Sequence, residues 1–279
     1  MSESTVVAPV RELPKLAAFV RRDLLVLFSY RLAFLSDVAN LAFQSITFYF
    51  VGRMIDPAAM PEFSGQRASY MAFIGIGIAL GAFMQIGLGR VVSAIRNEQL
   101  LGTLESLFMT PTRTLTIQVG LVVYDLIYVP IRTAVFLIIV TAVFGVSFVS
   151  AGLLPALAIL LAFIPLVWGL GMIGAAAVLT FRRGGGIVGF IGAGVSVASG
   201  AYFPLDLLPA PVARVLELSP VAVAFDSMRA ALIGGARWAE VLPDVGYLSA
   251  TAAASLTLGL WSVRAAVQRE RRLGTLSQY

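Results

Sequence analysis

The chain contains no cysteine and no histidine, and only 13% of its 279 residues are charged. The two missing residue types exclude disulfides, thiol chemistry, metal sites built from cysteine or histidine, and general-base catalysis by imidazole. A soluble globular domain carries about 25% charged and about 45–50% apolar residues. Here 59% of the residues are hydrophobic and the mean hydropathy is +0.91. Because so few charges cannot cover a water-exposed surface, the composition indicates an integral membrane protein.

Stretches without any Asp, Glu, Lys or Arg occur at 68–89, 133–181, 184–205 and 245–263. A helix needs about 20 residues to cross a hydrocarbon core about 30 Å thick, so three of these stretches fit one crossing each. The stretch 133–181 would be about 74 Å long as one helix and must therefore turn. We place its turn at small or helix-breaking residues, which are Gly145, Ser147, Ser150, Gly152 and Pro155.

The pattern predicts an all-α integral membrane protein with one transmembrane domain over residues 1–279. Helices are expected because an open sheet edge cannot be satisfied in lipid, and the runs lack the alternation of a membrane β-barrel. The six predicted spans are 32–51, 68–89, 115–144, 154–181, 187–202 and 245–263.

The distribution of basic residues predicts the orientation. With both ends on one side of the membrane, fourteen Lys and Arg residues fall on that side, against five on the other: Arg53, Arg67, Arg214, Arg229 and Arg237. The positive-inside rule therefore places both termini in the cytoplasm. Residues 11–30 alternate bulky apolar and basic side chains, which predicts an amphipathic helix lying in the cytoplasmic interface on membrane lipid. The basic residues are scattered beside apolar spans, so they do not indicate nucleic-acid binding.

A short amphipathic helix is predicted in the cytoplasm at 97–110. Asn97 is suited to cap it, Glu98 lies in its first turn, and Pro111 ends it. Its apolar residues fall on one face, which suits docking into a groove on a partner protein. An interfacial helix that only rests on lipid explains the same pattern equally well.

The loop 203–235 lies outside the membrane by this orientation, yet it is mostly apolar. Pro209 opens one short helix, and Ser219 followed by Pro220 starts a second that stops at Gly234–Gly235. Neither helix is long enough to span, so both are predicted to be re-entrant or buried at the interface. They serve either as an outer gate or as a structural plug against the bundle. The candidate gate residues are Phe203, Pro204, Pro209, Pro220 and Arg229.

Polar residues inside the predicted spans are candidates for lining a pathway, because each is costly in lipid unless paired or wet. The first span carries a stripe of four at helical spacing, which are Asp37, Asn40, Gln44 and Thr47. In the third span Asp125, Tyr128 and Arg132 share a face. Asp125 and Arg132 are about 10 Å apart along the axis, so Tyr128 is the candidate to bridge them. Polar contacts between helices explain these residues as well as a pathway does.

Two sets of residues resemble the membrane subunit of ATP-binding-cassette exporters of the type-2 permease family. The first set is Glu98, Gly102, Thr103, Leu104, Glu105, Leu107, Thr110 and Pro111, similar to the family stretch E-x-x-x-G-T-L-E-x-L-x-x-T-P. The second set is Phe203, Pro204, Leu208, Pro209, Ser219, Pro220, Arg229 and Gly234, and Ser219 stands where the family usually has Asn. Residues 21–31, RRDLLVLFSYR, also resemble the interface helix of that family.

The resemblance implies a type V exporter fold in the prokaryotic plasma (inner) membrane, working as a dimer of permeases, here a homodimer, with two copies of a separate ATPase. The ATPase stroke would be received by a coupling helix whose residues include Glu98, Gly102, Thr103, Leu104, Glu105, Leu107 and Phe108. ATP and Mg would bind the partner subunit, since this chain has no G-x-x-x-x-G-K-[ST] loop to cradle phosphates.

Glycines are better explained by packing than by nucleotide binding. Gly169, Gly171 and Gly174 match G-x-G-x-x-G, but no soluble strand precedes them and no acid follows about 20 residues on. Small residues also recur every three or four positions at Gly77, Gly81, Gln85 and Gly89, and at Gly185, Gly189, Gly192, Ser196 and Gly200. Such stripes let helices approach closely, within the chain or at a dimer seam.

The sequence thus predicts the permease subunit of an exporter without its own ATPase or metal site. A path between the first, second and fifth spans of two copies would carry a lipophilic or amphipathic small molecule, drug, lipid or peptide. A polysaccharide or lipid-linked glycan is the alternative cargo. An ion-coupled secondary transporter is the alternative from another class, but it would favour inverted repeats, and the two halves of the chain show no similarity.

Overall fold

The computed structural model describes residues 31–56, 60–100, 124–181, 192–196 and 198–273, together with residues 17, 20, 21, 25, 29 and 120. Helices dominate these residues. The long helices are α2 (Arg31–Gly52), α3 (Tyr70–Leu100), α6 (Asp125–Phe144), α7 (Leu153–Phe181) and α11 (Trp238–Leu273). The short elements are η2 (Ser150–Gly152), η3 (Leu205–Leu207), α9 (Ala210–Glu217), α10 (Pro220–Leu232) and the strands β1 (Glu62–Phe63) and β2 (Gln66–Arg67).

Four of the described helices are long and apolar enough to cross a membrane, which makes this a multi-pass membrane protein. Their apolar stretches are Tyr70–Gly89, Asp125–Phe144, Ser150–Val178 and Trp238–Arg269. Helix α2 covers the predicted first span to within one residue at each end but is not among these four. The predicted fifth span is described only from residue 192, and its helix gives way to a turn at Ser199 and Gly200. The six-span layout therefore remains a prediction.

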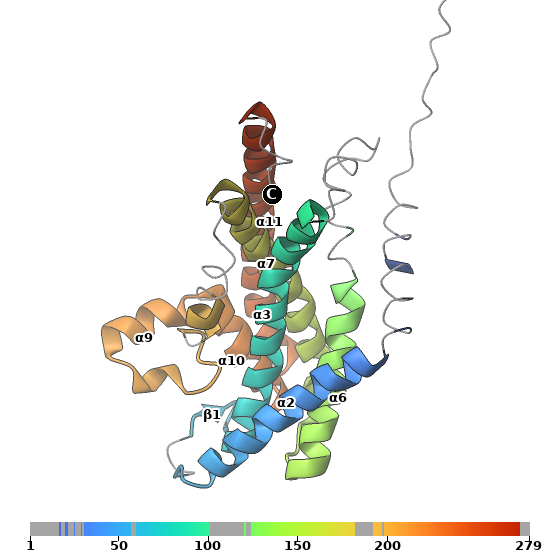
Figure 1. Cartoon of the computed structure of the whole chain (residues 1–279). Helices are drawn as coiled ribbons and strands as arrows, with labels where there is room; N and C mark the ends of the chain where they lie inside the picture. Colours follow the sequence, from blue (N-terminus) through green and yellow to red (C-terminus); the bar gives the residue numbers. More distant parts are fainter. Residues whose placement is uncertain are drawn as a thin grey trace, which may run out of the picture.

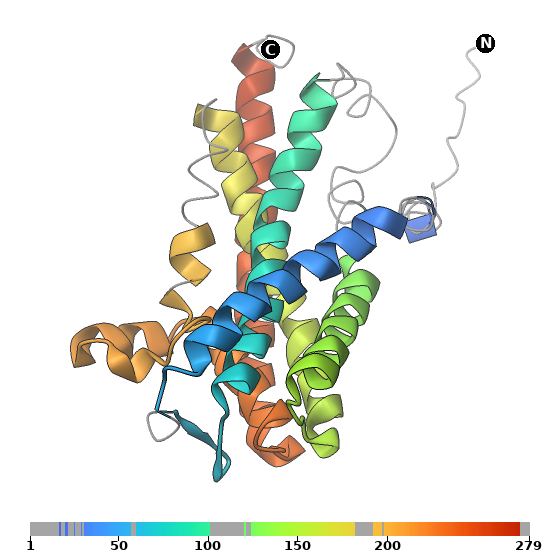
Figure 2. The same ribbon diagram turned by 60° about the horizontal axis from the view of Figure 1, so that its bottom comes forward.

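Helices α3, α7 and α11 form the centre of the bundle, and α7 packs closely on both of its neighbours. Figure 1 shows them running side by side, with α9 projecting to one side and the β-hairpin at one end. Helix α2 crosses obliquely over α3 and α6, as the turned view in Figure 2 makes clear. A seam of edge-to-face rings joins three elements in the core, because Phe163 of α7 contacts Phe83 of α3 and Phe225 of α10.

The turn predicted inside the long apolar run is confirmed. Helix α6 ends at Gly145, which adopts φ 67°, a left-handed conformation that glycine takes without a steric penalty. Residues 145–149 are non-helical, and η2 then leads into α7.

Two helices extend further than their charge-free runs. Helix α3 continues past Gly89 to Leu100, and α11 runs from Trp238 to Leu273. Charged residues at the ends of a helix lie beyond the apolar stretch and do not break it, so a charge-free run marks the membrane crossing rather than the helix. The expectation that Asn97 caps a separate helix is wrong, because α3 passes through it unbroken.

The segment 203–235 follows its capping signals. Helix α9 starts at Ala210 after Pro209, and α10 starts at Pro220. The Ser219 side chain accepts a hydrogen bond from the amide of Val221 at 3.4 Å, as expected of an N-cap. The segment stops at Gly235, which has φ 66°. Both α9 and α10 thus begin at the positions that Pro209 and Ser219 predicted.

Small residues bring the central helices together at positions where no side chain fits. A Cβ on Gly259 of α11 would lie 2.6 Å from the carbonyl oxygen of Gly169 and 2.8 Å from Cβ of Met172, both on α7. A Cβ on Gly171 would lie 2.9 Å from the carbonyl oxygen of Gly87 on α3. Gly169 and Gly171 therefore serve the close packing of helices. Their match to a dinucleotide-binding motif is a coincidence.

The two predicted stripes of small residues meet each other within the chain. A Cβ on Gly77 would overlap the carbonyl oxygen of Ala201, and one on Gly192 would lie 2.9 Å from Oε1 of Gln85. Gly77, Gly81 and Gln85 of the first stripe thus pack α3 against Gly192, Ser196 and Ala201, whereas a Cβ on Gly89 would meet nothing within 4 Å.

We expect Gly259→Ala to lower the free energy of unfolding by about 1–3 kcal/mol, because the added methyl group forces α7 and α11 apart against backbone atoms. Gly246→Ala on the same helix is the matched control, since a Cβ there meets nothing within 4 Å. It should be neutral or stabilising by up to about 1 kcal/mol through the higher helix propensity of alanine. Unfolding in mixed detergent and sodium dodecyl sulfate measures both. Equal effects of the two substitutions would show that the close approach is not what matters at Gly259.

Candidate functional site

Arg229 of α10 is buried to 1% exposure and fastens α10 to two other parts of the chain. Its Nη2 donates to the carbonyl oxygens of Gly200 at 2.8 Å and Ala201 at 3.2 Å. Its Nε donates to the carbonyl oxygen of Phe73 on α3 at 3.4 Å, and its Nη1 lies 3.1 Å from the half-exposed carboxylate of Asp226. One guanidinium thus satisfies acceptors in the turn at Gly200 and Ala201 and at the start of α3.

Aromatic rings enclose the same guanidinium. Its central carbon lies 3.5 Å from the ring centroid of Phe73 and 5.8 Å from that of Phe225, so cation–π attraction adds to the hydrogen bonds. Burial lowers the pKa of Arg229 to about 10, and the carboxylate of Asp226 acts in the opposite direction. The guanidinium therefore stays protonated at neutral pH and keeps all of its donors.

The other predicted gate residues are distributed over the segment 203–220. Pro204 is buried, Phe203 and Pro220 are partly buried, and Pro209 at the start of α9 is exposed. Two contacts fix the segment to α11: the hydroxyl of Tyr247 donates to the carbonyl oxygen of Leu218 at 2.7 Å, and Ser227 donates to Asp244. Helix α10 therefore packs against α3, α7 and α11. A gating role for these residues remains a prediction.

A polar cluster joins α2 to α6. Arg132 of α6, 2% exposed, forms an ion pair with Asp37 of α2, donating from Nε to one carboxylate oxygen and from Nη2 to the other at 3.1 Å. Tyr128 donates to the same carboxylate at 3.1 Å. The sequence predicted that Tyr128 bridges Asp125 and Arg132. In the structure Tyr128 and Arg132 both donate hydrogen bonds to Asp37 instead.

Asp125 is held by a third helix. Its carboxylate accepts a hydrogen bond from Nε1 of Trp168 on α7 at 3.2 Å, and both side chains are buried. The ring of Tyr124 stacks on that of Tyr128, with centroids 5.4 Å apart. Trp168 was not identified from the sequence, although an indole N–H inside an apolar span signals that it needs an acceptor.

The stripe on α2 is divided between two surroundings. Asp37 and Gln44 are partly buried on the side that faces the bundle, whereas Asn40 and Thr47 are exposed. The first pair belongs to the contacts between helices. The second pair lies on a surface that this chain alone leaves uncovered.

Most of the predicted coupling helix falls outside the described residues. Glu98 lies in the last turn of α3. Gly102, Thr103, Leu104, Glu105, Leu107 and Phe108 lie in the segment 101–119, of which the structure gives no account. Among the residues that are described, no three histidines, cysteines or carboxylates are grouped so that they could hold a metal ion.

The chain was compared with known proteins. A family model described as ABC-2 family transporter protein matches residues 25–261, from just before α2 to the last third of α11. A search of curated proteins gave no match.

Proposed function

The chain belongs to the ABC-2 family of transporter proteins, and on this basis we propose that it is the permease subunit of an exporter driven by a separate ATPase. The cargo we propose is a lipophilic or amphipathic small molecule, drug, lipid or peptide, moved outward. The observation that carries the proposal is the family match over most of the chain, together with the lack of a phosphate-binding loop in its sequence.

The assembly we propose contains two copies of this chain and two copies of the ATPase, which binds ATP and Mg. It lies in the prokaryotic inner membrane with both termini in the cytoplasm, as the basic residues favour. The hairpin end of the bundle would then face outward. Helices α9 and α10 would be the re-entrant outer helices.

The exposed polar residues of α2 support a path shared by two copies. Asn40 and Thr47 are exposed on the same helix as the exposed apolar residues Leu35, Phe43 and Phe50. A helix face that meets only lipid does not carry Asn without cost. Contact with a second copy of the chain, or with a water-filled route beside α2, removes that cost. This supports a path that α2, the first span, shares with the second and fifth spans of the two copies.

The proposal is tested first by purifying the tagged chain from its own host in mild detergent and identifying what accompanies it by mass spectrometry. A stoichiometric soluble protein with a G-x-x-x-x-G-K-[ST] loop is the expected result. Purification of the chain alone in several detergents would contradict the proposal, and ion-coupled transport in liposomes would then be measured.

We expect Glu105→Lys to abolish stimulation of the partner's ATPase activity, because it reverses a charge in the proposed coupling helix. Glu217→Lys makes the same charge change at an exposed position of α9, outside the proposed coupling helix, and should leave stimulation unchanged. ATP hydrolysis by the purified complex in liposomes is the measurement. Full stimulation with Glu105→Lys would remove that residue from the coupling contact.

A further inference from the structure

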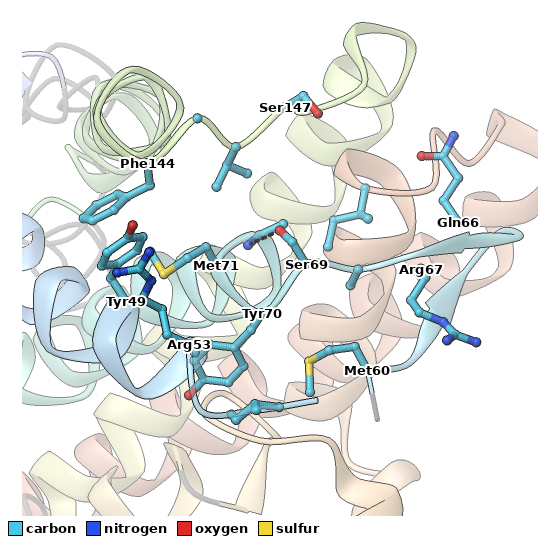
Figure 3. A pocket seen from close by; sticks show the side chains of 17 residues that line it. Tyr49, Arg53, Met60, Gln66, Arg67, Ser69, Tyr70, Met71, Phe144 and Ser147 are labelled. Atoms are coloured by element: carbon cyan, nitrogen blue, oxygen red, sulfur yellow. Dashed lines mark hydrogen bonds between the residues drawn. The ribbon is translucent and has the colours of Figure 1, made fainter. Parts of the chain in front are cut away.

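A cavity of about 530 Å³ opens at the hairpin end of the bundle. It is enclosed by the end of α2, the β-hairpin, the first turn of α3, the segment after α6, and Ile233 after α10. Figure 3 shows Arg53 beside Tyr49 on one side, Arg67 with Gln66 on the other, and Tyr70 and Met60 below. None of the contacts described above uses this space.

The charged residues that line the cavity are all basic. Arg53 and Arg67 both line it, and no Asp or Glu is among its described lining residues. Arg53 lies with its guanidinium 5.6 Å from the ring centroid of Tyr49. Arg67 pairs with Glu62 across the hairpin at 2.9 Å, but both side chains are about half exposed, and such pairs contribute little. An anion in the cavity therefore meets one guanidinium group on each side, at little cost in existing contacts.

The first turn of α3 adds hydrogen-bond donors and the matching dipole. Ser69 lines the cavity and caps α3, accepting from the amide of Ala72 at 3.2 Å. The N-terminus of a helix favours a negative charge, and here the start of α3 lines the same cavity as the two arginines. The hydroxyl of Tyr70 is a further polar group on the lining.

The depth of the cavity matches the boundary of the membrane. The apolar stretch of α3 begins at Tyr70 and that of α6 ends at Phe144, and both residues line the cavity. Tyrosine and arginine at the end of apolar stretches are typical of the headgroup level. The same cavity also has an apolar part, formed by Met60, Met71, Val146 and Ile233, all buried. Phe50 near the end of α2 and Met54 in the turn after it are exposed apolar side chains, at 61% and 88%.

We propose that this cavity binds the phosphate-bearing head of an anionic amphiphile from the leaflet at the hairpin end. The phosphate lies between Arg53, Arg67 and the start of α3, and the apolar chain leaves along the exposed end of α2. The site goes beyond the proposed transport function, because it requires neither an ATPase partner nor movement of the bound molecule.

The test is isothermal titration of the purified chain in detergent with dioctanoyl phosphatidic acid. We expect Arg53→Ala and Arg67→Ala each to weaken binding about tenfold, as the loss of one charge-assisted contact does. Glu62→Gln should strengthen binding, because it frees Arg67 from its present partner. Arg214→Ala removes another exposed arginine, from α9, and should change nothing.

Two further binding measurements identify the source of the anion and separate loss of binding from loss of folding. Binding of dioctanoyl phosphatidic acid in excess of inorganic phosphate supports the amphiphile; equal binding of inorganic phosphate would overturn it in favour of a free anion. Ser147→Trp changes no charge but fills the cavity from its exposed rim, and it should reduce binding as well. If both arginine variants bind as tightly as the unmodified chain, or dioctanoyl phosphatidylcholine binds equally well, the site does not exist as proposed. Both results are independent of whether an ATPase accompanies the chain.

Discussion

Arg229→Leu is expected to lower the free energy of unfolding by about 3–5 kcal/mol. Leucine removes the donors that satisfy the carbonyl oxygens of Gly200, Ala201 and Phe73 in a buried site. It also ends the stacking of the guanidinium on the ring of Phe73. Helix α10 would then lose the hydrogen bonds that connect it to α3 and to Gly200 and Ala201 in one step.

Unfolding in mixed detergent and sodium dodecyl sulfate measures this loss. Arg214→Leu is the matched control, because Arg214 is exposed in α9 and its loss should stay within about 0.5 kcal/mol. Arg229→Lys should recover only part of the stability, since an ammonium group keeps the charge but cannot donate as a planar fork to three directions. If Arg229→Leu and Arg214→Leu behave alike, Arg229 does not hold α10 in place.

Asp37→Leu should also cost about 3–5 kcal/mol, because it leaves the buried guanidinium of Arg132 without the carboxylate to which it donates twice. The double variant Asp37→Leu/Arg132→Leu should recover most of this loss. Apolar residues in place of a whole buried pair are tolerated, whereas a single remaining charge is not. The interaction free energy between the two positions is the quantity to measure.

The same double variant separates the two interpretations of this cluster. If it is stable and still supports substrate-stimulated ATP hydrolysis with the partner, the pair serves as a contact between α2 and α6. If it is stable and transport is lost, the charges themselves belong to the route. A double variant as unstable as Asp37→Leu would show that the pairing does not account for the cost.

Features that depend on a few neighbouring residues could be predicted from the sequence. The start of α10 at Ser219 and Pro220 and the turn at Gly145 both form as expected, because caps and left-handed glycines are decided locally. The rejection of Gly169 and Gly171 as nucleotide ligands also holds, since their surroundings are helix backbones.

Features that depend on how helices pack could not be predicted. The polar residues of the first and third spans were each recognised, but not that Asp37 accepts from both Tyr128 and Arg132, because nothing in either span specifies which faces meet. Arg229 was recognised as a candidate gate residue, yet its burial depends on carbonyl oxygens 28 and 29 residues earlier in the chain and on α3. The hairpin at Ser64 and Gly65 was not predicted, although a Ser-Gly pair in a sequence is typical of a turn. Both residues have positive φ in the structure, as a two-residue hairpin turn requires.

The unbroken course of α3 has a mechanical consequence. Its 31 residues extend about 46 Å, with Glu98 in the last turn and Phe73 in the first. No turn interrupts the helix between them, so one continuous helix joins the start of the proposed coupling segment to the surroundings of Arg229. The ring of Phe73 stacks against the guanidinium of Arg229. A displacement of α3 would therefore act on Arg229 at one end of the helix, as well as on α2, α6 and α7, against which α3 packs.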